Sequence, residues 1–437
     1  MASDPHWHEP ARDLPVMGRP DVLVVGAGSA GVAAALGSAR RGAETWLVEA
    51  SSFVGGLATL GLINLLLTLD DGDGHQVVAG LCQEFVDRLE ARGEARYPPP
   101  EEWNLEDPGL VDHWRRWGLI WGAPPEAVRY SVAFDPESFI DVAYHALGAA
   151  NVRLRLHTWC AGTAVADGIV QAVIVESKLG RQAILPGVVI DATGDADVFV
   201  ASGATVDHVT IPPYLWFRVG GVDEEALRES PGGFWFRTTG RGRVLVPWGP
   251  AADRVDPCDP DDMTRAQLAC RASARASFDA LRRDVPAFAD AWIDDYARML
   301  GITESRRLQG DYVLEKGDGD VRFPDSVAQT GHWTKRHVVY DIPYRCLTAP
   351  GHHNLLAVGR CISTTRYVHQ ATKEIPAAMA TGEAAGAAAV HALEAGGRVD
   401  RVDVEGLRRD LRAAGACVGG PDGPARDGPG PASRPQI

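Results

Sequence analysis

The sequence predicts an α/β fold that begins with a strand–helix–strand unit around a glycine-rich turn. Residues 21–25 form a short β-branched run ending at a glycine, which is typical of a parallel strand buried on both faces. Residues 30–40 are rich in alanine, favour a helix and stop near Gly42. Residues 45–49 are predicted as the second strand. The length of 437 residues allows two or three domains with a large buried core.

The remaining elements follow from hydrophobic periodicity and from turn residues. Helices are expected at 81–93, 136–147, 264–300 and 376–393, and strands within 152–175, 187–192, 215–219, 243–248 and 354–358. Asp135 is the expected N-cap of the helix at 136–147, and Pro136 suits its first turn. Residues 97–125, rich in Pro, Trp and acids, predict a long irregular excursion. Residues 1–20 are expected to form a flexible leader, and the Pro/Gly-rich residues 419–437 a disordered tail.

Composition and charge exclude several classes of protein. Apolar residues make up 45% and charged residues 23%, as in ordinary globular proteins. The net charge of −15 argues against nucleic acid or anionic lipid as partner. The longest apolar run, residues 56–69, is shorter than the roughly 18 to 20 residues of a membrane span. Seven cysteines without a CxxC pair indicate reduced thiols, so a cytoplasmic protein is expected.

The strongest motif is a Gly-x-Gly-x-x-Gly pattern between the first strand and the first helix. Gly26 permits the tight turn, Gly28 lets the backbone approach a pyrophosphate, and Gly31 lets helix and strand pack closely. The amides at the helix N-terminus then attract phosphates. Glu49 ends the second strand, 18 residues after Gly31 (49 − 31), where its carboxylate can accept hydrogen bonds from ribose hydroxyls. The pattern predicts dinucleotide binding; the alternative is a chance glycine turn.

Later glycine sites indicate which dinucleotide is bound. A glycine pair at 55–56 follows the acidic residue, and strands at 188–192 and 355–358 each open into a glycine turn. Glycine sites spread over the whole chain favour FAD, which would stretch across a domain, rather than NAD, which would be held in one half of it. The later two sites could also be ordinary strand-ending turns. From these patterns, Gly26, Gly28, Gly31 and Glu49 are expected to contact the cofactor.

Several segments, in order along the chain, resemble the FAD-dependent oxidoreductase family of the glutathione-reductase-like flavoprotein superfamily. These segments are residues 21–56, 134–136, 189–197, 217–223, 303–307, 341–345 and 356–363. The resemblance implies a Rossmann-type FAD-binding domain built from discontinuous segments, with an inserted α+β substrate domain. The implied FAD domain comprises 21–80, 130–205 and 335–395, and the implied substrate or cap domain comprises 81–129 and 206–334. The resemblance also implies that Asp195 lies near the phosphate end of FAD. The residues expected to hold the cofactor are then Gly26, Gly28, Ala30, Gly31, Glu49, Gly55, Gly56, Gly194, Asp195, Gly359 and Arg360.

Hydride transfer to a flavin needs an anchored substrate and often a base. Candidate anchors are Arg306, Tyr344, Arg345, Arg366 and Lys373, and candidate bases are His208, His337, His353 and His369. The family commonly has histidine and glutamate where this chain has Arg366 and Tyr367, and arginine in place of Lys373. These departures predict an altered substrate. Each candidate could instead form a structural ion pair. The spacing of His, Cys and acidic residues predicts no metal site.

The predicted function is therefore an FAD-dependent dehydrogenase or oxidase acting on a small organic molecule. The substrate would be an alcohol, an amine or a saturated bond undergoing desaturation. A second Gly-x-Gly-x-x-Gly is missing from the sequence, which favours oxygen, a quinone or a redox protein as electron acceptor. The N-terminus of the last helix, near Pro376, would stabilise negative charge on reduced flavin. Tryptophans within 97–125 and 216–248 either line an apolar pocket or, more commonly, serve packing.

Two other functions are possible. An aromatic hydroxylase is disfavoured, since such enzymes usually have Gly-Asp at the last flavin turn and this chain has Gly359-Arg360. A non-catalytic binding protein on the same scaffold is disfavoured by the intact cofactor fingerprint.

Overall fold

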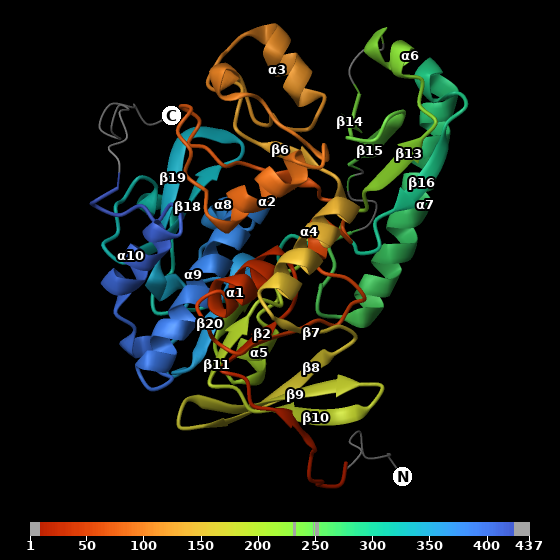
Figure 1. Cartoon of the computed structure of the whole chain (residues 1–437). Coiled ribbons are helices and arrows are strands. Elements are labelled where there is room, and N and C mark those ends of the chain that lie inside the picture. Colours follow the sequence, from red (N-terminus) through yellow and green to blue (C-terminus); the bar gives the residue numbers. More distant parts are fainter. Residues whose placement is uncertain (1–8, 230–232, 248, 250–252, 424–437) are drawn as a thin grey trace.

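The computed structural model describes residues 9–229, 233–247, 249 and 253–423. Its centre is a parallel five-stranded sheet in the order β20-β11-β2-β3-β7 (Figure 1). The strands are β2 (Val22–Val25), β3 (Thr45–Val48), β7 (Arg153–Arg155), β11 (Val188–Asp191) and β20 (Leu355–Ala357). The four residues of β2 are buried, as a central strand covered on both faces requires. Because β3 and β11 lie on opposite sides of β2, a crevice is expected at the carboxyl end of β2.

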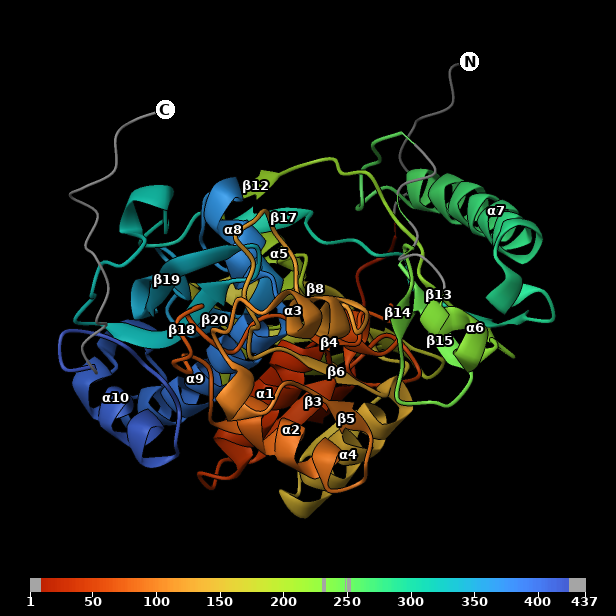
Figure 2. The same ribbon diagram turned by 90° about the horizontal axis from the view of Figure 1, so that it is seen from above.

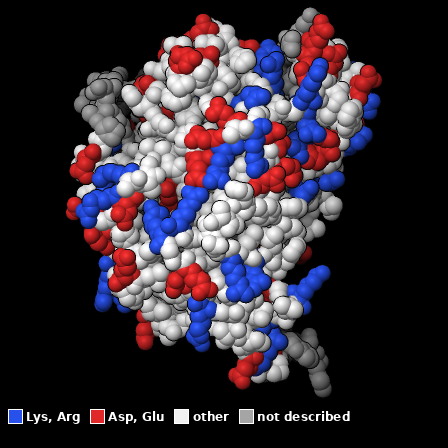
Figure 3. Space-filling view, in the orientation of Figure 1, with Lys and Arg blue, Asp and Glu red and all other residues white. Residues whose placement is uncertain are grey.

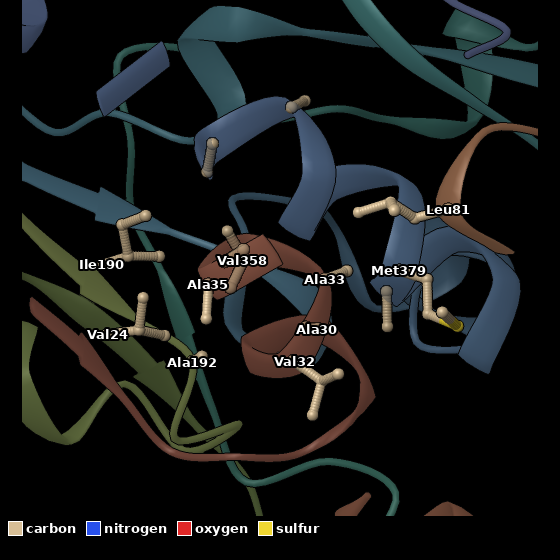
Figure 4. Packing of buried hydrophobic residues seen from close by; sticks show 14 of the residues in the cluster. Val24, Ala30, Val32, Ala33, Ala35, Leu81, Ile190, Ala192, Val358 and Met379 are labelled. Carbon is tan, nitrogen blue, oxygen red and sulfur yellow. The ribbon is translucent and has the colours of Figure 1, made fainter. Parts of the chain in front are cut away.

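Helices α1 (Ser29–Ala39) and α9 (Ile375–Glu394) pack against each other beside this sheet (Figures 1 and 4). Glycines allow the two backbones to approach: a Cβ at Gly382 would lie 3.0 Å from the carbonyl carbon of Ala30, and a Cβ at Gly386 would lie 2.9 Å from the Ser38 amide nitrogen. The last helix thus packs closely against the helix that follows the glycine-rich turn.

Smaller sheets surround the central one. One contains β1 (Val16–Gly18), β8 (Trp159–Ala166), β9 (Ile169–Ser177) and β10 (Gly180–Ile184). Another contains β13 (Phe217–Gly220), β14 (Phe236–Arg237), β15 (Arg243–Val246) and β16 (Trp292–Tyr296). A three-stranded sheet consists of β4 (Leu65–Leu66), β5 (Ala95–Arg96) and β6 (Val132–Phe134), and two strand pairs consist of β12 (Val206–His208) with β17 (Arg306–Leu308) and β18 (Ser326–His332) with β19 (Lys335–Pro343). The sheet of β13 to β16 lies beside α7 and away from α10 (Figure 2).

The other α-helices connect and cover these sheets. They are α2 (Leu81–Glu90), α3 (Pro108–Arg115), α4 (Pro136–Ala149), α5 (Asp197–Ala201), α6 (Glu224–Glu229), α7 (Pro260–Asp284), α8 (Arg366–Thr372) and α10 (Val404–Ala413). The predicted cap of α4 is confirmed, because the Asp135 side chain accepts a hydrogen bond from the Ser138 amide (2.9 Å). Helix α3 lies inside the excursion predicted to be irregular.

Three predictions about elements are wrong in part. The helix expected at 264–300 ends at Asp284, because Pro286 disfavours a helical conformation at the residue before it, and β16 follows. The expected flexible leader contains β1, which pairs with β10. The expected disordered tail begins with ordered residues, since the Gly420 amide donates to Asp341 Oδ2 (2.7 Å). Residues 1–8 and 424–437 lie outside the described residues.

The surface carries acidic and basic side chains side by side. On the face shown in Figure 3, both kinds are interspersed rather than gathered into one basic field. Within the described residues, no helix has the length and apolar character that crossing a membrane demands.

Candidate functional site

The glycine-rich turn connects β2 to α1 at the carboxyl edge of the parallel sheet. Gly26 has a φ of 97°, and a Cβ there would lie 2.5 Å from the Ala192 carbonyl oxygen, so only glycine fits. Gly28 is the N-cap of α1 and offers no side-chain cap to the first-turn amides. A Cβ at Gly28 would meet no described atom within 4 Å. The turn therefore presents free helix-terminal amides to open space.

The later glycine sites converge on this turn. Gly28 and Gly55 form an isolated β-bridge, and a Cβ at Gly56 would lie 3.1 Å from Gly28 Cα. From the far end of the chain, a Cβ at Gly359 would lie 2.9 Å from Ala30 Cβ. Segments more than 300 residues apart (359 − 30) thus meet at the N-terminus of α1.

Glu49 lies at the same edge, directly after β3. Its carboxylate accepts hydrogen bonds from the Ala27 amide (2.7 Å) and the Ser51 amide (2.7 Å), which fix it beside the glycine turn. Each carboxylate oxygen keeps a second lone pair for a ligand hydroxyl. On the neighbouring strand β7, Arg155 has a buried Nε without a hydrogen-bond partner among the described residues. Unmet polar groups at this position suit the adenosine end of a dinucleotide.

These features test whether the residues fit FAD. Open space at Gly28, uncapped amides of α1, an acceptor at Glu49 and a buried unpaired Nε at Arg155 lie along one edge of the sheet. Phosphates, ribose hydroxyls and an adenine offer the complementary groups. The site therefore fits FAD.

A charged network lies over Gly194, between the glycine turn and β17. Arg360 Nε donates to the Gly194 carbonyl oxygen (2.9 Å), and Arg360 Nη2 donates to Asp195 Oδ1 (2.5 Å). Asp195 also accepts a hydrogen bond from the Ser305 hydroxyl. Arg360 thus joins the glycine turn at Gly194 to the glycine turn at Gly359 through hydrogen bonds. The expected cofactor residues Gly194, Asp195, Gly359 and Arg360 lie together here.

A second charged group occupies the junction of α8 and α9. Lys373 Nζ donates to Glu374 Oε1 (2.7 Å), and the two side chains are only 11% and 12% exposed. The ring centroid of Trp333 lies 5.6 Å from Lys373 Nζ. Loss of solvent, followed by the charge of Glu374, raises the pKa of the Tyr214 hydroxyl. Glu374 is the N-cap of α9, where the helix dipole favours a negative charge.

His369 lies one turn before Lys373 on α8 and is fully buried. Its Nε2 lies 2.9 Å from the Thr303 carbonyl oxygen, which can only accept, so Nε2 carries the proton. The other ring nitrogen, Nδ1, has no hydrogen-bond partner in the part of the chain that the structure describes. Burial, followed by the nearby positive charges, lowers the pKa of His369 well below 6.5. The imidazole is therefore neutral, with a free lone pair.

The other candidate bases are engaged at the surface. His208 pairs with Asp256 (2.8 Å), His337 pairs with Asp73 (2.7 Å), and His353 lies 3.5 Å from Asp400. In each case a ring nitrogen faces a partly exposed carboxylate.

The remaining candidate anchors also have protein partners. The Tyr344 hydroxyl donates to the Val399 carbonyl (2.9 Å), Arg345 Nε donates to Asp325 (2.8 Å), and Arg366 Nη2 donates to Glu304 (2.7 Å). Arg306 pairs with Asp197. Of the five predicted anchors, Lys373 is the one whose charge lies beside His369 and the start of α9.

Sequence reasoning missed several residues of this region. Glu374 stands two residues before Pro376, an acidic N-cap pattern that could have identified it. Thr381 Oγ1 accepts from the Gly359 amide (3.1 Å), and Trp333 arrives from the end of β18. The sequence holds no signal for either residue, because their positions depend on tertiary packing.

Comparison with known proteins agrees with this geometry. Residues 21–411 match the family described as FAD dependent oxidoreductase, and the chain belongs to this family. It is therefore an FAD-dependent enzyme of the oxidoreductase class, as the sequence predicts. A comparison with curated protein sequences gave no match.

Solved structures are similar to this chain at low sequence identity. One is p-nitrophenol 4-monooxygenase PnpA from Pseudomonas putida DLL-E4, which is 14% identical over 91% of this chain and 88% of that chain, with a TM-score of 0.49. Another is L-amino acid deaminase from Proteus vulgaris, which is 14% identical over 86% of this chain and 94% of that chain, with a TM-score of 0.48. A geranylgeranyl bacteriochlorophyll reductase-like protein from Thermoplasma acidophilum is 13% identical over 91% of this chain and 84% of that chain, with a TM-score of 0.46. The family match does not test the finer prediction of a dehydrogenase or oxidase, which stays a prediction.

Proposed function

We propose that this enzyme removes a hydride from a carbon bearing oxygen or nitrogen in a small organic substrate, with His369 as the proton acceptor. The observation that carries the proposal is the fully buried, neutral His369 with an unpartnered Nδ1, one helical turn from Lys373, whose side chain is largely covered. A group with this burial and a free lone pair is a candidate for proton transfer.

The proposed cofactor contacts follow the converging glycine turns. The amides after Gly28 would hold the pyrophosphate, Glu49 the ribose, and the backbone near Gly359 the ribityl and flavin end. When bound, FAD supplies an acceptor for a hydride and its two electrons.

The chain's own residues then manage the proton and the substrate. Oxidation of an alcohol or amine leaves an O–H or N–H proton on an increasingly electron-poor atom. Such a proton becomes strongly acidic, so His369 suffices as its acceptor even though burial lowers the pKa of this imidazole. The hydrogen bond from Nε2 to Thr303 holds the ring in the tautomer that leaves Nδ1 free. Lys373 would orient the polar group of the substrate, with Glu374 balancing its charge.

We propose the division into domains that the sequence predicts, with one change. All strands of the parallel sheet fall in the segments assigned to FAD, and β13 to β16 fall within 206–334, around a second hydrophobic cluster. Helix α2 packs into the first cluster, together with α4 and α9. Its packing favours a substrate domain that starts after β5 rather than at residue 81.

A hydroxylase is the second candidate, and an aromatic cavity favours it. A cavity of about 370 Å³ between α3 and β14 is lined by Ile120, Trp121, Leu227, Trp235, Phe236 and Arg237. The ring centroids of Trp121 and Trp333 lie 5.5 Å apart in an edge-on arrangement, and Lys373 lies over the Trp333 ring. Aromatic contacts thus connect the cavity to the α8–α9 junction. A cavity of this kind suits a flat or apolar substrate.

Anaerobic screening distinguishes the two candidates. The FAD-loaded enzyme is mixed with alcohols, amines and hydroxy acids without oxygen, and loss of the visible flavin absorbance is followed. Reduction by substrate alone is expected. The proposal is refuted if these compounds leave the flavin oxidised, while an aromatic compound gains an oxygen atom from O₂ in the presence of an added reductant.

A variant tests the assigned base. His369→Gln places an amide nitrogen where imidazole Nε2 lies, so it can still donate to the Thr303 carbonyl, but it has no basic nitrogen. Flavin reduction is expected to slow at least about 100-fold, the lower range for general-base catalysis, with FAD still bound. The matched control is His391→Gln, which changes a histidine of α9 that pairs with Asp410. Equal reduction rates in His369→Gln and His391→Gln would remove His369 from the mechanism.

A further inference from the structure

A cluster of three potential metal ligands lies where β12 meets the start of α7. β12 pairs with β17, and the two strands lie side by side in Figure 2. Beyond β12, Ile211 and Val255 form an antiparallel bridge with two backbone hydrogen bonds (3.0 and 2.9 Å). This bridge brings His208, at the end of β12, next to Asp256 and Cys258, just before α7.

The three side chains face one another. His208 Nε2 lies 2.8 Å from Asp256 Oδ1, and one ligand atom from each of His208, Asp256 and Cys258 lies within 4.8 Å of the other two. Zn²⁺ bonds of about 2.0 Å to nitrogen and 2.3 Å to sulfur place tetrahedral ligands roughly 3.5 Å apart. All three side chains are at least partly exposed, so small rotamer changes can bring them to these distances.

The backbone holds two of the ligands in place. The Cys258 amide donates to Asp256 Oδ1 (2.8 Å), and the Asp256 amide donates to Asp262 Oδ2 (2.8 Å) in the first turn of α7. Asp259 caps the same helix through the amides of Asp261 and Asp262. The Asp256-x-Cys258 turn is thus fixed to the helix before any metal binds, which lowers the entropy lost on binding.

The exposure of Cys258 is a second, independent observation. All seven cysteines lie in the described part of the chain, and Cys258 alone among them is exposed. Free cysteines are usually buried, and an exposed His–Asp pair contributes little stability by itself. An exposed thiol beside an imidazole and a carboxylate is instead the donor set of a zinc site.

We propose that His208, Asp256 and Cys258 bind one Zn²⁺ ion, with water in the fourth position. On binding, the Cys258 thiol loses its proton to solvent and its thiolate bonds to the metal, without any redox change. The charges of Arg306, Asp195 and Asp197 act on Cys258, so the site adjoins the network over Gly194. The ion would tie the start of α7 to β12 beside the FAD site. This site differs from the sequence-based expectation, because its ligands are 48 residues apart (256 − 208) and meet only in the fold.

Metal binding to the FAD-loaded full chain tests the proposal. Metal-free protein is titrated with Zn²⁺ and, separately, with Co²⁺, whose bond to a thiolate gives a near-ultraviolet charge-transfer band. One ion per chain with a Kd below about 10 μM is expected, together with release of one proton and appearance of that band. Cys258→Ser should abolish the band, and His208→Ala should weaken binding at least tenfold. Cys417→Ser, which removes a partly buried cysteine elsewhere, is the matched control.

Two results would overturn the proposal. One is a Co²⁺ band that persists in Cys258→Ser, which would place the thiolate ligand elsewhere. The other is binding in the wild type that is weaker than about 1 mM or unchanged in both variants, which would mean an adventitious ion only. Because the readouts are metal content and spectra, they do not depend on the substrate or on His369.

Discussion

The crossing of α1 and α9 makes a quantitative prediction about Gly382. In Gly382→Ala the new methyl group would lie 3.0 Å from the Ala30 carbonyl carbon and closer still to its oxygen. Both neighbours are helix backbone, so the clash cannot be relieved by a side-chain rotation. Overpacking at the upper end of its usual range costs about 3 kcal/mol. The better helix propensity of alanine offsets about 1 kcal/mol, and the net loss of unfolding free energy is roughly 2 kcal/mol.

Calorimetric unfolding at saturating FAD measures this loss. An unfolding entropy of about 2.1 cal/mol/K per residue over 437 residues is roughly 0.9 kcal/mol/K, so the Tm is expected to fall by about 2 °C. Gly148→Ala is the matched control: it lies in α4, and its added Cβ would meet no described atom within 4 Å. The control should gain up to about 1 kcal/mol. An equal or higher Tm in Gly382→Ala would refute the argument that glycine sets the approach of the two helices.

Two further predictions concern the site, and a third concerns the buried histidine His332 at the end of β18. Gly28→Val should fold but purify without FAD, because the side chain enters the open space at the turn; a flavin-loaded variant would contradict the assigned pyrophosphate position. Lys373→Ala should keep FAD yet slow flavin reduction at least tenfold, about 1.4 kcal/mol, and wild-type stopped-flow kinetics would remove Lys373 from the site. Burial, followed by nearby positive charges, lowers the pKa of His332 from 6.5 to about 4. The unfolded state therefore binds more protons between these pH values, and roughly 3 kcal/mol of the unfolding free energy at pH 7 is lost as the pH falls from 6.5 to 4. In urea titrations, His332→Asn should flatten the slope of unfolding free energy against pH. An unchanged slope would contradict the burial argument.

Local patterns predicted well the strand, glycine-rich turn and helix that open the fold. Gly26, Gly28 and Gly31 occupy their expected places because one short segment determines strand, turn and helix. The resemblance of later segments placed Gly194 and Gly359 at the same cofactor, which periodicity alone could not do. Helix α7 was predicted too long, because its alanine- and arginine-rich sequence continues past the break at Pro286.

The substrate side of the site was much harder to predict. His369 was one of four candidate histidines with equal standing in the sequence, and only the structure shows its burial and its unpartnered Nδ1. Pairings such as Arg306 with Asp197 and Arg345 with Asp325 join residues far apart, so their charges looked available for substrate. Tertiary contacts decided each of these cases.

The position of β20 at the edge of the parallel sheet affects how the protein matures in the cell. The turn at Gly28 leaves the ribosome early, whereas Gly359 follows only after 331 more residues (359 − 28). At about 5 to 20 residues per second, that interval lasts roughly 20 to 60 seconds. The parallel sheet is therefore completed only when translation is almost finished, and until β20 emerges, β11 is an edge strand with unpaired backbone groups.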